Sequence, residues 1–296
     1  MDSRIGANAC ACAGTPLRFA NHPLGEWINV KLLVAAIAAA TAVSVLPASA
    51  GASDARPAAP MAKAVVKASA TDVAEGDRVT FKVKVPKARA AKRVVLQERY
   101  VSVFGDPMWK DVTSTRAKRR VSFAQTVTSL NEAAYRVSVT YRERVKPVVS
   151  KPVTLTVWRW IELRRFTPYV QTTSATYYQA TINGVAHAAW GPYATGVMRS
   201  WEARVTPGRN CTRFRAVLGL ADTSDDGSSG VVSFTVDEAT TVYTSPTLTP
   251  GIAVPVEIDL ARPYRFAMSA TNTSADKVKA LPLVGSGAFY CTGIDD

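Results

Sequence analysis

The sequence of 296 residues predicts an all-β protein built from two β-sandwich domains. Apolar and polar residues alternate in many short runs: Phe81, Val83 and Val85, for example, are separated by Lys82 and Lys84. Such alternation is typical of strands that bury one face. After residue 50 no long run shows the 3.6-residue period of a helix, and turn residues separate the runs. The length favours two domains rather than one.

Residues 31–50 have the pattern of a secretory signal peptide. Lys31 precedes an apolar run from Leu32 to Val45, and Ala48-Ser49-Ala50 offers a cleavage site. The apolar run is shorter than the roughly 20 residues that a transmembrane helix needs. We therefore expect residues 1–50 to be an N-terminal extension and a removed signal peptide, and the protein to be secreted, extracellular or cell-wall associated, without a transmembrane anchor. Residues 51–61 are small, polar and Pro-containing and predict a flexible lead.

The first domain is expected at residues 62–157 as an immunoglobulin-like sandwich. Seven strands are predicted, at 64–70, 79–85, 93–101, 109–114, 119–127, 133–142 and 151–157. The turn Val73–Asp77, the strand Trp109–Val112 and the Tyr135-Arg136-Val137 stretch make this domain resemble the bacterial Ig-like modules of secreted proteins. Because no cysteine pair crosses this sandwich, its core is expected to hold by packing alone.

Positive charge is concentrated in this first domain. Residues 61–160 hold 21 Lys plus Arg against 8 Asp plus Glu, whereas residues 161–296 hold 11 against 12. Such an excess of positive charge favours binding to polyanions. An exported protein is expected to meet an anionic envelope polymer, an acidic polysaccharide or an anionic membrane surface rather than nucleic acid. The alternative is a solvated surface without a partner. The candidate contact residues are Lys118, Arg119, Arg120, Arg142 and Arg144.

The second domain is expected at residues 158–296. Its opening segment, Trp158–Tyr169, is too aromatic for a solvated linker and predicts that the domains are closely coupled. An Asn183-Gly184 turn predicts a hairpin. Further strands are predicted at 212–220, 230–237, 240–245, 253–260, 264–270 and 287–292. Cys211 and Cys291 are the two cysteines that remain after residue 50, and outside the cell such a pair is expected to form a disulfide.

Catalytic chemistry finds little support. The part of the chain after residue 50 holds one histidine, His187, which lies among apolar residues. A hydrolase would need His187 beside a serine, or two carboxylates in a cleft; we expect no enzyme and no cofactor. The acidic stretch with Asp222, Asp225 and Asp226 fits an exposed turn. Calcium binding through several of its oxygens is the alternative, although the stretch lacks the spacing of a known calcium loop and no metal site is predicted.

Residues 210–294 carry motifs of a known family. They are Cys211–Phe214 (CTRF), Leu218–Asp222 (LGLAD), Val232–Val236 (VSFTV), Tyr243–Thr249 (YTSPTLT) and the alternating run Val254–Leu260. In this order they resemble the carbohydrate-binding module family abbreviated NPCBM. The resemblance implies a galactose-binding-like β-sandwich of jelly-roll type that binds carbohydrate. A structural or protein-interaction (adhesion) module without a glycan site is the alternative.

If a sugar is bound, exposed aromatic rings are expected to stack on it. The candidates lie around Gly191-Pro192, outside the regular alternation, and packing in the core is the alternative for each of them. They are Trp190, Tyr193, Trp201, Tyr177 and Tyr178.

Overall fold

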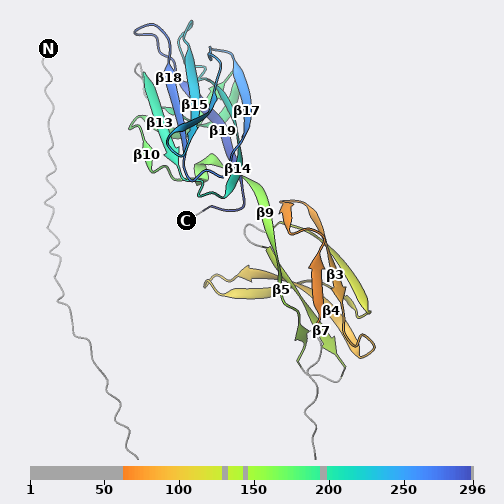
Figure 1. Cartoon of the computed structure of the whole chain (residues 1–296). Coiled ribbons are helices and arrows are strands. Elements are labelled where there is room, and N and C mark those ends of the chain that lie inside the picture. The colour runs from red at the N-terminus through yellow and green to blue at the C-terminus, as the bar shows by residue number, and fades with distance from the viewer. Residues whose placement is uncertain (1–62, 129–132, 143–145, 194–198, 295–296) are drawn as a thin grey trace, which may run out of the picture. The chain divides into compact units, whose positions relative to one another are not determined.

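The computed structural model describes residues 63–128, 133–142, 146–193 and 199–294, and there the protein is all-β, as predicted (Figure 1). One short 3₁₀ turn, Leu163–Arg165, accompanies the strands. None of the helical structure in these ranges is long and apolar enough to cross a membrane. The predicted signal peptide, residues 31–50, and the lead, residues 51–61, lie outside the described residues.

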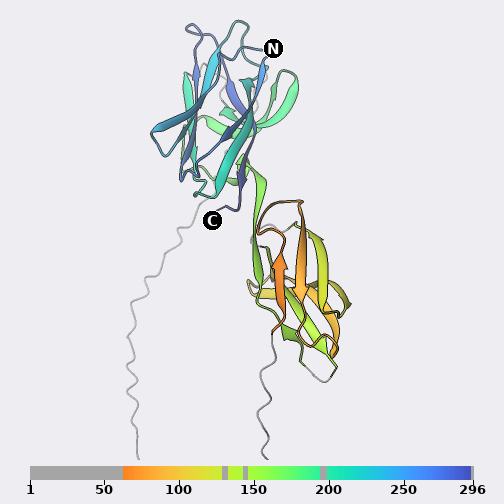
Figure 2. The same cartoon turned by 45° about the vertical axis from the view of Figure 1, so that its right-hand side comes forward.

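The N-terminal half of the described chain forms two facing sheets (Figure 2). The smaller sheet has the order β1-β3-β6, with β1 at Val65–Ala68, β3 at Arg78–Lys84 and β6 at Arg120–Thr126. The facing strands are β4 (Ala91–Val101), β5 (Pro107–Arg116), β7 (Ala133–Tyr141), β8 (Val148–Val149), β9 (Val153–Glu162) and β2 (Asp72–Ala74). The seven strands predicted here are all present, and β2 and β8 are additional.

Alternating apolar residues of the two sheets meet in one core that runs from Ala64 to Val157. At its centre the rings of Phe81 and Tyr135 lie 4.6 Å apart, and both residues are fully buried. The hydroxyl of Tyr135 donates to the Glu98 carboxylate at 2.8 Å, and Lys110 Nζ lies 2.9 Å from the same carboxylate. Glu98 can therefore be buried because both a hydroxyl and a cation compensate its charge.

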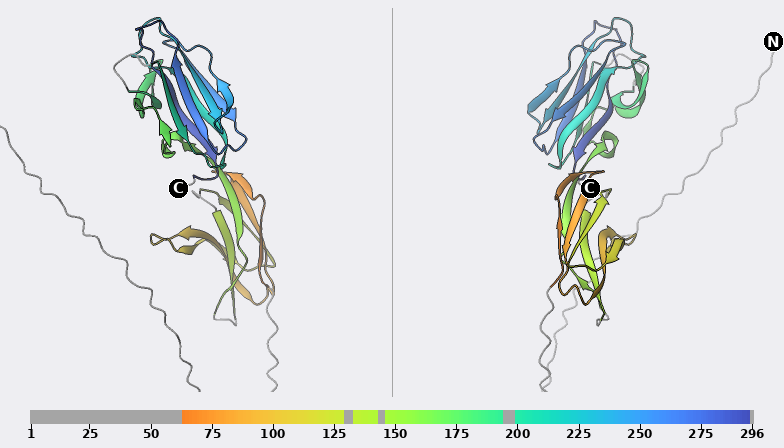
Figure 3. Two further views of the ribbon diagram at one scale, coloured as in Figure 1. Left: turned by 60° about the vertical axis from the view of Figure 1, so that its left-hand side comes forward. Right: turned by 90° about the vertical axis from the view of Figure 1, so that its right-hand side faces the viewer.

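Strand β9 pairs with strands of both halves, and its course can be followed in Figure 3. Its first residues, Val153–Leu155, pair with β7, and Thr156–Trp158 pair in parallel with β2. Its last residues, 159–162, pair with β19 (Pro282–Cys291). In the expected link at residues 158–169, the first five residues are thus strand and Leu163–Arg165 form the 3₁₀ turn. The assignment of two domains divided at 157/158 remains a proposal, because β9 crosses that position without a break.

The aromatic residues of this link have two environments: Phe166 is buried in the second core against Phe289, whereas Trp160 is only partly buried. Trp160 stands opposite Tyr290, with ring centroids 5.2 Å apart. The guanidinium of Arg215 lies 4.2 Å from the Trp160 ring centroid, and that of Arg213 lies 4.3 Å from that of Tyr290. These cation–π contacts explain how Trp160 and Tyr290 can remain partly exposed.

The C-terminal half is a second sandwich. One sheet has the order β10-β13-β18-β15-β16. Its strands are β10 (Val170–Gln171), β13 (Ser200–Val205), β18 (Phe266–Asn272), β15 (Gly230–Val236) and β16 (Thr240–Thr244). The facing sheet contains β11 (Ala175–Ile182), β12 (Val185–Pro192), β19, β14 (Cys211–Leu220) and β17 (Ala253–Asp259). The predicted hairpin is present, and positive φ angles at Asn183 (49°) and Gly184 (74°) form its turn.

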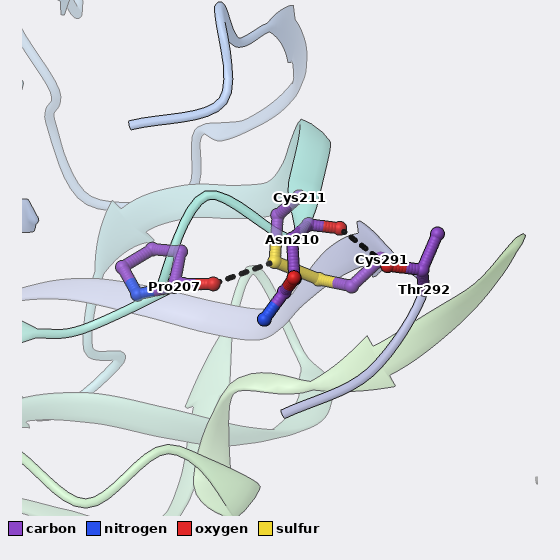
Figure 4. Close-up of a disulfide and its surroundings, with 5 residues drawn as sticks. All are labelled: Pro207, Asn210, Cys211, Cys291 and Thr292. Carbon is purple, nitrogen blue, oxygen red and sulfur yellow. Dashed lines mark hydrogen bonds between the residues drawn. A yellow bond between two sulfur atoms is a disulfide. The ribbon is translucent and has the colours of Figure 1, made fainter. Parts of the chain in front are cut away.

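Aromatic rings fill the second core. Phe214 contacts Phe234, Phe266 and Phe289 at centroid distances of 4.7–5.1 Å. The predicted disulfide between Cys211 and Cys291 is present (Figure 4) and joins the first residue of β14 to the last residue of β19. Beside the bond, the backbone amide of Thr292 donates to the Asn210 carbonyl at 3.0 Å. Both cysteines are fully buried, so the bond is part of the core.

Candidate functional site

The five aromatic candidates do not share one surface. Trp190 and Trp201 are regular members of β12 and β13, and they are only 5% and 2% exposed. The Trp201 indole N–H donates to the carbonyl of Pro282 at 2.8 Å. The structure thus gives these two residues the packing role that was the alternative for each, and corrects the expectation that they lie outside regular strands.

Tyr193, in contrast, is 73% exposed. Its ring makes an edge contact with that of Tyr178, at a centroid distance of 5.5 Å. The Tyr178 hydroxyl donates to the carbonyl of Pro192, and burial raises the pKa of Tyr178. Tyr177 turns to the other side and packs edge-on against Trp190. Tyr193 is therefore the exposed member of the predicted aromatic group, and the half-buried Tyr178 supports its ring.

His187 does lie beside a serine. Its Nδ1 is 2.9 Å from the Ser286 hydroxyl, and the histidine is 9% exposed. Ser286 has a φ of 48° because β19 bulges between its pairings with Val217 and Arg215. Among the described residues no carboxylate holds the second ring nitrogen, so the arrangement lacks the orienting group of a triad.

The carboxylates of the acidic stretch hold turns in place. Asp222 accepts a hydrogen bond from the Gly184 amide at 2.9 Å, and Asp225 accepts one from the Lys279 amide at 2.7 Å. The first bond lowers the pKa of Asp222, with burial opposing it. Nowhere in the described ranges do three or more His, Cys, Asp or Glu side chains gather as metal ligands.

The charged candidates of the first half are on its surface. Lys118, Arg119 and Arg120 are exposed where the chain enters β6, and Arg142 is exposed just after β7. The amide of Arg142 donates to the carbonyl of Ala90, beside a hollow that Arg119 also lines. Arg144 lies outside the described residues.

A small polar pocket opens on the outer face of the sheet β10-β13-β18-β15-β16. Its volume is about 150 Å³. It arises because outward positions of β13, β15 and β18 come into register, and because the chain before β10 crosses one side. Its lining residues are Tyr169, Glu202, Arg204, Thr235, Glu238, Arg265, Ala267 and Ser269.

Ion pairs hold the walls of this pocket. Arg204 binds Glu202 in a two-pronged contact, with Nε to Oε1 at 2.7 Å and Nη2 to Oε2 at 3.3 Å. Hydrogen bonding to Glu202 and then its charge raise the pKa of Arg204. Arg265 pairs with Glu238 and lies 5.1 Å from the ring centroid of Tyr169. Each charge has a partner, so these groups are held in place before any ligand arrives.

Hydroxyl groups continue outward from the pocket. In the sheet register Glu202 stands opposite Ser269, Ser269 opposite Ser233, and Ser233 opposite Thr244. The hydroxyls of Ser233 and Thr244 lie 3.3 Å apart. This row crosses four strands and adds groups that both donate and accept hydrogen bonds. An aromatic ring, fixed charges and hydroxyls together suit a polar ring such as a sugar better than an apolar ligand.

The sequence prediction did not identify this pocket. Tyr169 was seen only as the end of a linking segment, and Arg204 and Arg265 were not singled out. A usable signal is present in Ser200–Val205, where the outward positions of SWEARV carry opposite charges two residues apart. Which strands stand beside β13 could not be inferred from that pattern.

Comparisons with solved structures return carbohydrate-binding modules at low identity. One is CBM51 of a Clostridium perfringens GH95 protein in complex with methyl-galactose: 12% identity, TM-score 0.36, covering 44% of this chain and 99% of that one. Another is the tandem CBM51 pair of a family 98 glycoside hydrolase from Streptococcus pneumoniae SP3-BS71: 12% identity, TM-score 0.37, covering 74% and 82%. A third is the M60 catalytic domain with two CBM51 domains from Clostridium perfringens ZmpB: 11% identity, TM-score 0.37, covering 78% of this chain but 31% of that one. All three scores lie below 0.5.

No curated protein matches the chain. A family model does match residues 167–279 of this chain. These residues span the strands that form the polar pocket, from Tyr169 before β10 through Ser269 in β18. The C-terminal half of the chain therefore contains an NPCBM/NEW2 domain.

Proposed function

We propose that the protein is an exported, non-catalytic binding protein whose C-terminal sandwich binds carbohydrate at the Tyr169 pocket. One observation carries the proposal: the matched segment, residues 167–279, encloses a pocket in which a tyrosine ring stands beside fixed ion pairs and hydroxyls. At about 150 Å³ the pocket is smaller than the roughly 300–1,000 Å³ of drug-sized sites, so it suits one sugar ring or a chain end.

In this proposal each wall has a role. Tyr169 is 41% exposed, and its ring offers a face to the C–H groups of a pyranose. Glu202 accepts hydrogen bonds from sugar hydroxyls, while Arg204 and Arg265 donate them. Because Glu202 and Arg204 already bind each other, little side-chain freedom is lost when a ligand binds.

The test is a glycan array followed by calorimetry with the glycan that binds. Tyr169→Ala is expected to weaken binding by about tenfold or more, the range of a lost stacking contact. Tyr264→Ala is the matched control, because Tyr264 is similarly exposed and does not line the pocket. Arg204→Gln should also weaken binding, through the loss of a charged donor.

Tyr193→Ala tests the other location that the sequence predicted for a sugar, the exposed ring of Tyr193. If Tyr193→Ala abolishes binding and Tyr169→Ala does not, the sugar lies against Tyr193 and Tyr178, and the Tyr169 pocket is rejected. If no glycan binds at all, the alternative of a structural or adhesion module without a glycan site is favoured.

Two further parts of the proposal have their own checks. Export predicts a mature N-terminus at Gly51, which Edman sequencing of the secreted protein reads directly. Absence of catalysis predicts that Ser286→Ala and wild type release p-nitrophenol from p-nitrophenyl acetate at the same rate. A slower Ser286→Ala protein would show that Ser286 and His187 act as a catalytic pair.

A further inference from the structure

The outer face of the three-stranded sheet β1-β3-β6 is strongly cationic. Alternation sends the apolar residues of each strand inward, and the register places the outward residues side by side. Five of these outward residues are basic and exposed, and we call them the cationic sheet face: Lys67, Arg78, Lys82, Lys84 and Arg120.

Like charges stand directly opposite each other on this face. Lys67 of β1 pairs with Lys82 of β3, and Lys84 of β3 pairs with Arg120 of β6. Like charges in such positions destabilise a sheet. Of the ion pairs that the described residues form, none involves a member of the cationic sheet face. The fold alone gives no reason for this arrangement, because threonine or glutamate would suit these positions better.

The face is also hollowed. A depression of about 650 Å³ is lined by Lys67, Lys82, Lys84 and Arg120. A second depression of about 550 Å³ shares Lys84 with the first and adds Lys87, Arg89 and Arg119. The two depressions are neighbours that share Lys84, and together their basic lining residues offer more cations than a single small anion requires.

We propose that the cationic sheet face binds a linear acidic polysaccharide, a chain that carries one anionic group per repeat. Outward residues follow each other at about 7 Å along a strand and about 5 Å across strands. Several cations can therefore contact successive anionic groups of one chain. Such binding releases counterions and removes the repulsion between the paired lysines, so the cost built into the sheet is recovered on binding.

A chain-like ligand fits better than a flat bilayer. The basic side chains line two neighbouring depressions, and the sole exposed large apolar residue among the lining residues is Val65. A membrane-inserting surface would present apolar side chains beside its cations. The inference does not rest on the Tyr169 pocket, which belongs to the other sandwich.

The experiment measures binding to immobilised polygalacturonate by biolayer interferometry from 25 to 300 mM NaCl. The expected result is binding whose log affinity falls linearly with log salt. The variant K67Q/K82Q/K84Q/R120Q should bind at least tenfold more weakly. The control K151Q/R165Q/R209Q/K277Q changes the net charge equally at exposed residues elsewhere and should stay within threefold of wild type. Circular dichroism confirms that both variants fold.

Two results would overturn the proposal. One is an equal loss in both variants, which would mean that only net charge matters. The other is binding to vesicles of phosphatidylglycerol and phosphatidylcholine (1:3) without binding to polygalacturonate, which would make the face a membrane surface. Tyr169→Ala should bind polygalacturonate like wild type, so a failed sugar pocket and a failed cationic sheet face give different results.

Discussion

Single carboxylates connect loops that lie far apart in the sequence of the C-terminal sandwich. Asp222 follows β14, yet it holds the Gly184 amide in the turn between β11 and β12. Asp225 holds the Lys279 amide from the stretch that precedes β19. A residue that composition describes only as acidic and exposed thus fixes the position of a neighbouring turn.

Asp222→Ala is predicted to destabilise the protein in a pH-dependent way. The folded-state pKa of Asp222 lies below its ordinary value, so the carboxylate stabilises the fold above its unfolded-state pKa of about 3.9. That contribution is lost as the pH falls through the lower folded-state pKa. At pH 7 we expect a loss of about 0.5 kcal/mol, because the group is exposed and solvent screens it.

Urea unfolding at several pH values between 7 and 2.5 measures this effect, and the difference from wild type should shrink toward pH 2.5. Asp226→Ala is the control, since Asp226 is exposed in the same loop and contributes no hydrogen bond among those of the described residues. A difference that stays constant with pH would contradict the assignment.

The strands were largely predictable because apolar and polar residues alternate along a half-buried strand. β3, β7 and β17 were expected within one or two residues of where they lie. β2 and β8, of three and two residues, were not expected, since such short strands depend on the partner strand that pairs with them. β13 was missed although its residues alternate, because Trp201 was considered as a surface residue.

The pocket and the cationic sheet face depend on register, which a single sequence does not reveal. Lys82 and Lys84 were visible as alternating residues of one strand. That Lys67 stands opposite Lys82, from a strand more than ten residues earlier, follows from the hairpin-like pairing of β1 with β3. Likewise Glu202, Ser269 and Ser233 are brought together only by the order of the sheet.

Lys82→Glu is predicted to raise stability and lower polymer binding at once. A glutamate at this position faces Lys67 across the sheet and replaces a repulsion by an attraction. Cross-strand charge pairs contribute roughly 0.2–1 kcal/mol, so a rise in Tm of a few degrees at most is expected. Differential scanning calorimetry and the polygalacturonate assay measure the two effects.

Lys110→Glu provides a contrast in the same half of the chain. Lys110 lies 2.9 Å from the Glu98 carboxylate, so this reversal should lower Tm and leave polymer binding largely intact. If Lys82→Glu also lowered Tm, the repulsion between opposite lysines would not be a real cost of the cationic sheet face.

At the scale of the whole molecule the two sandwiches are stabilised differently. The second is closed by the disulfide between residues 80 positions apart, whereas the described part of the first relies on packing. The loop-closure model assigns the disulfide about 3 to 5 kcal/mol of stability. Reduction is therefore predicted to lower the stability of the C-terminal sandwich far more than that of the N-terminal one.

Chemical unfolding with and without a reducing agent tests this difference. Two variants are used, in which every other tryptophan is replaced by phenylalanine. The fluorescence of Trp109 then reports on the N-terminal sandwich and that of Trp201 on the C-terminal one. The expected outcome is a shift of the Trp201 transition to lower denaturant with a smaller change at Trp109. A common shift of both transitions would show that the halves unfold as one cooperative unit.

Strand β9 has a mechanical consequence. Along one backbone, three residues pair with β7, the next three with β2 and the last four with β19. If the cationic sheet face holds one polymer and the Tyr169 pocket another, tension between the two attachments passes along this strand. Its hydrogen bonds run across the direction of pull, so they are loaded together in shear and are not peeled apart one at a time. A strand paired in this way transmits tension between the halves with little change in length, whereas a flexible linker would first extend.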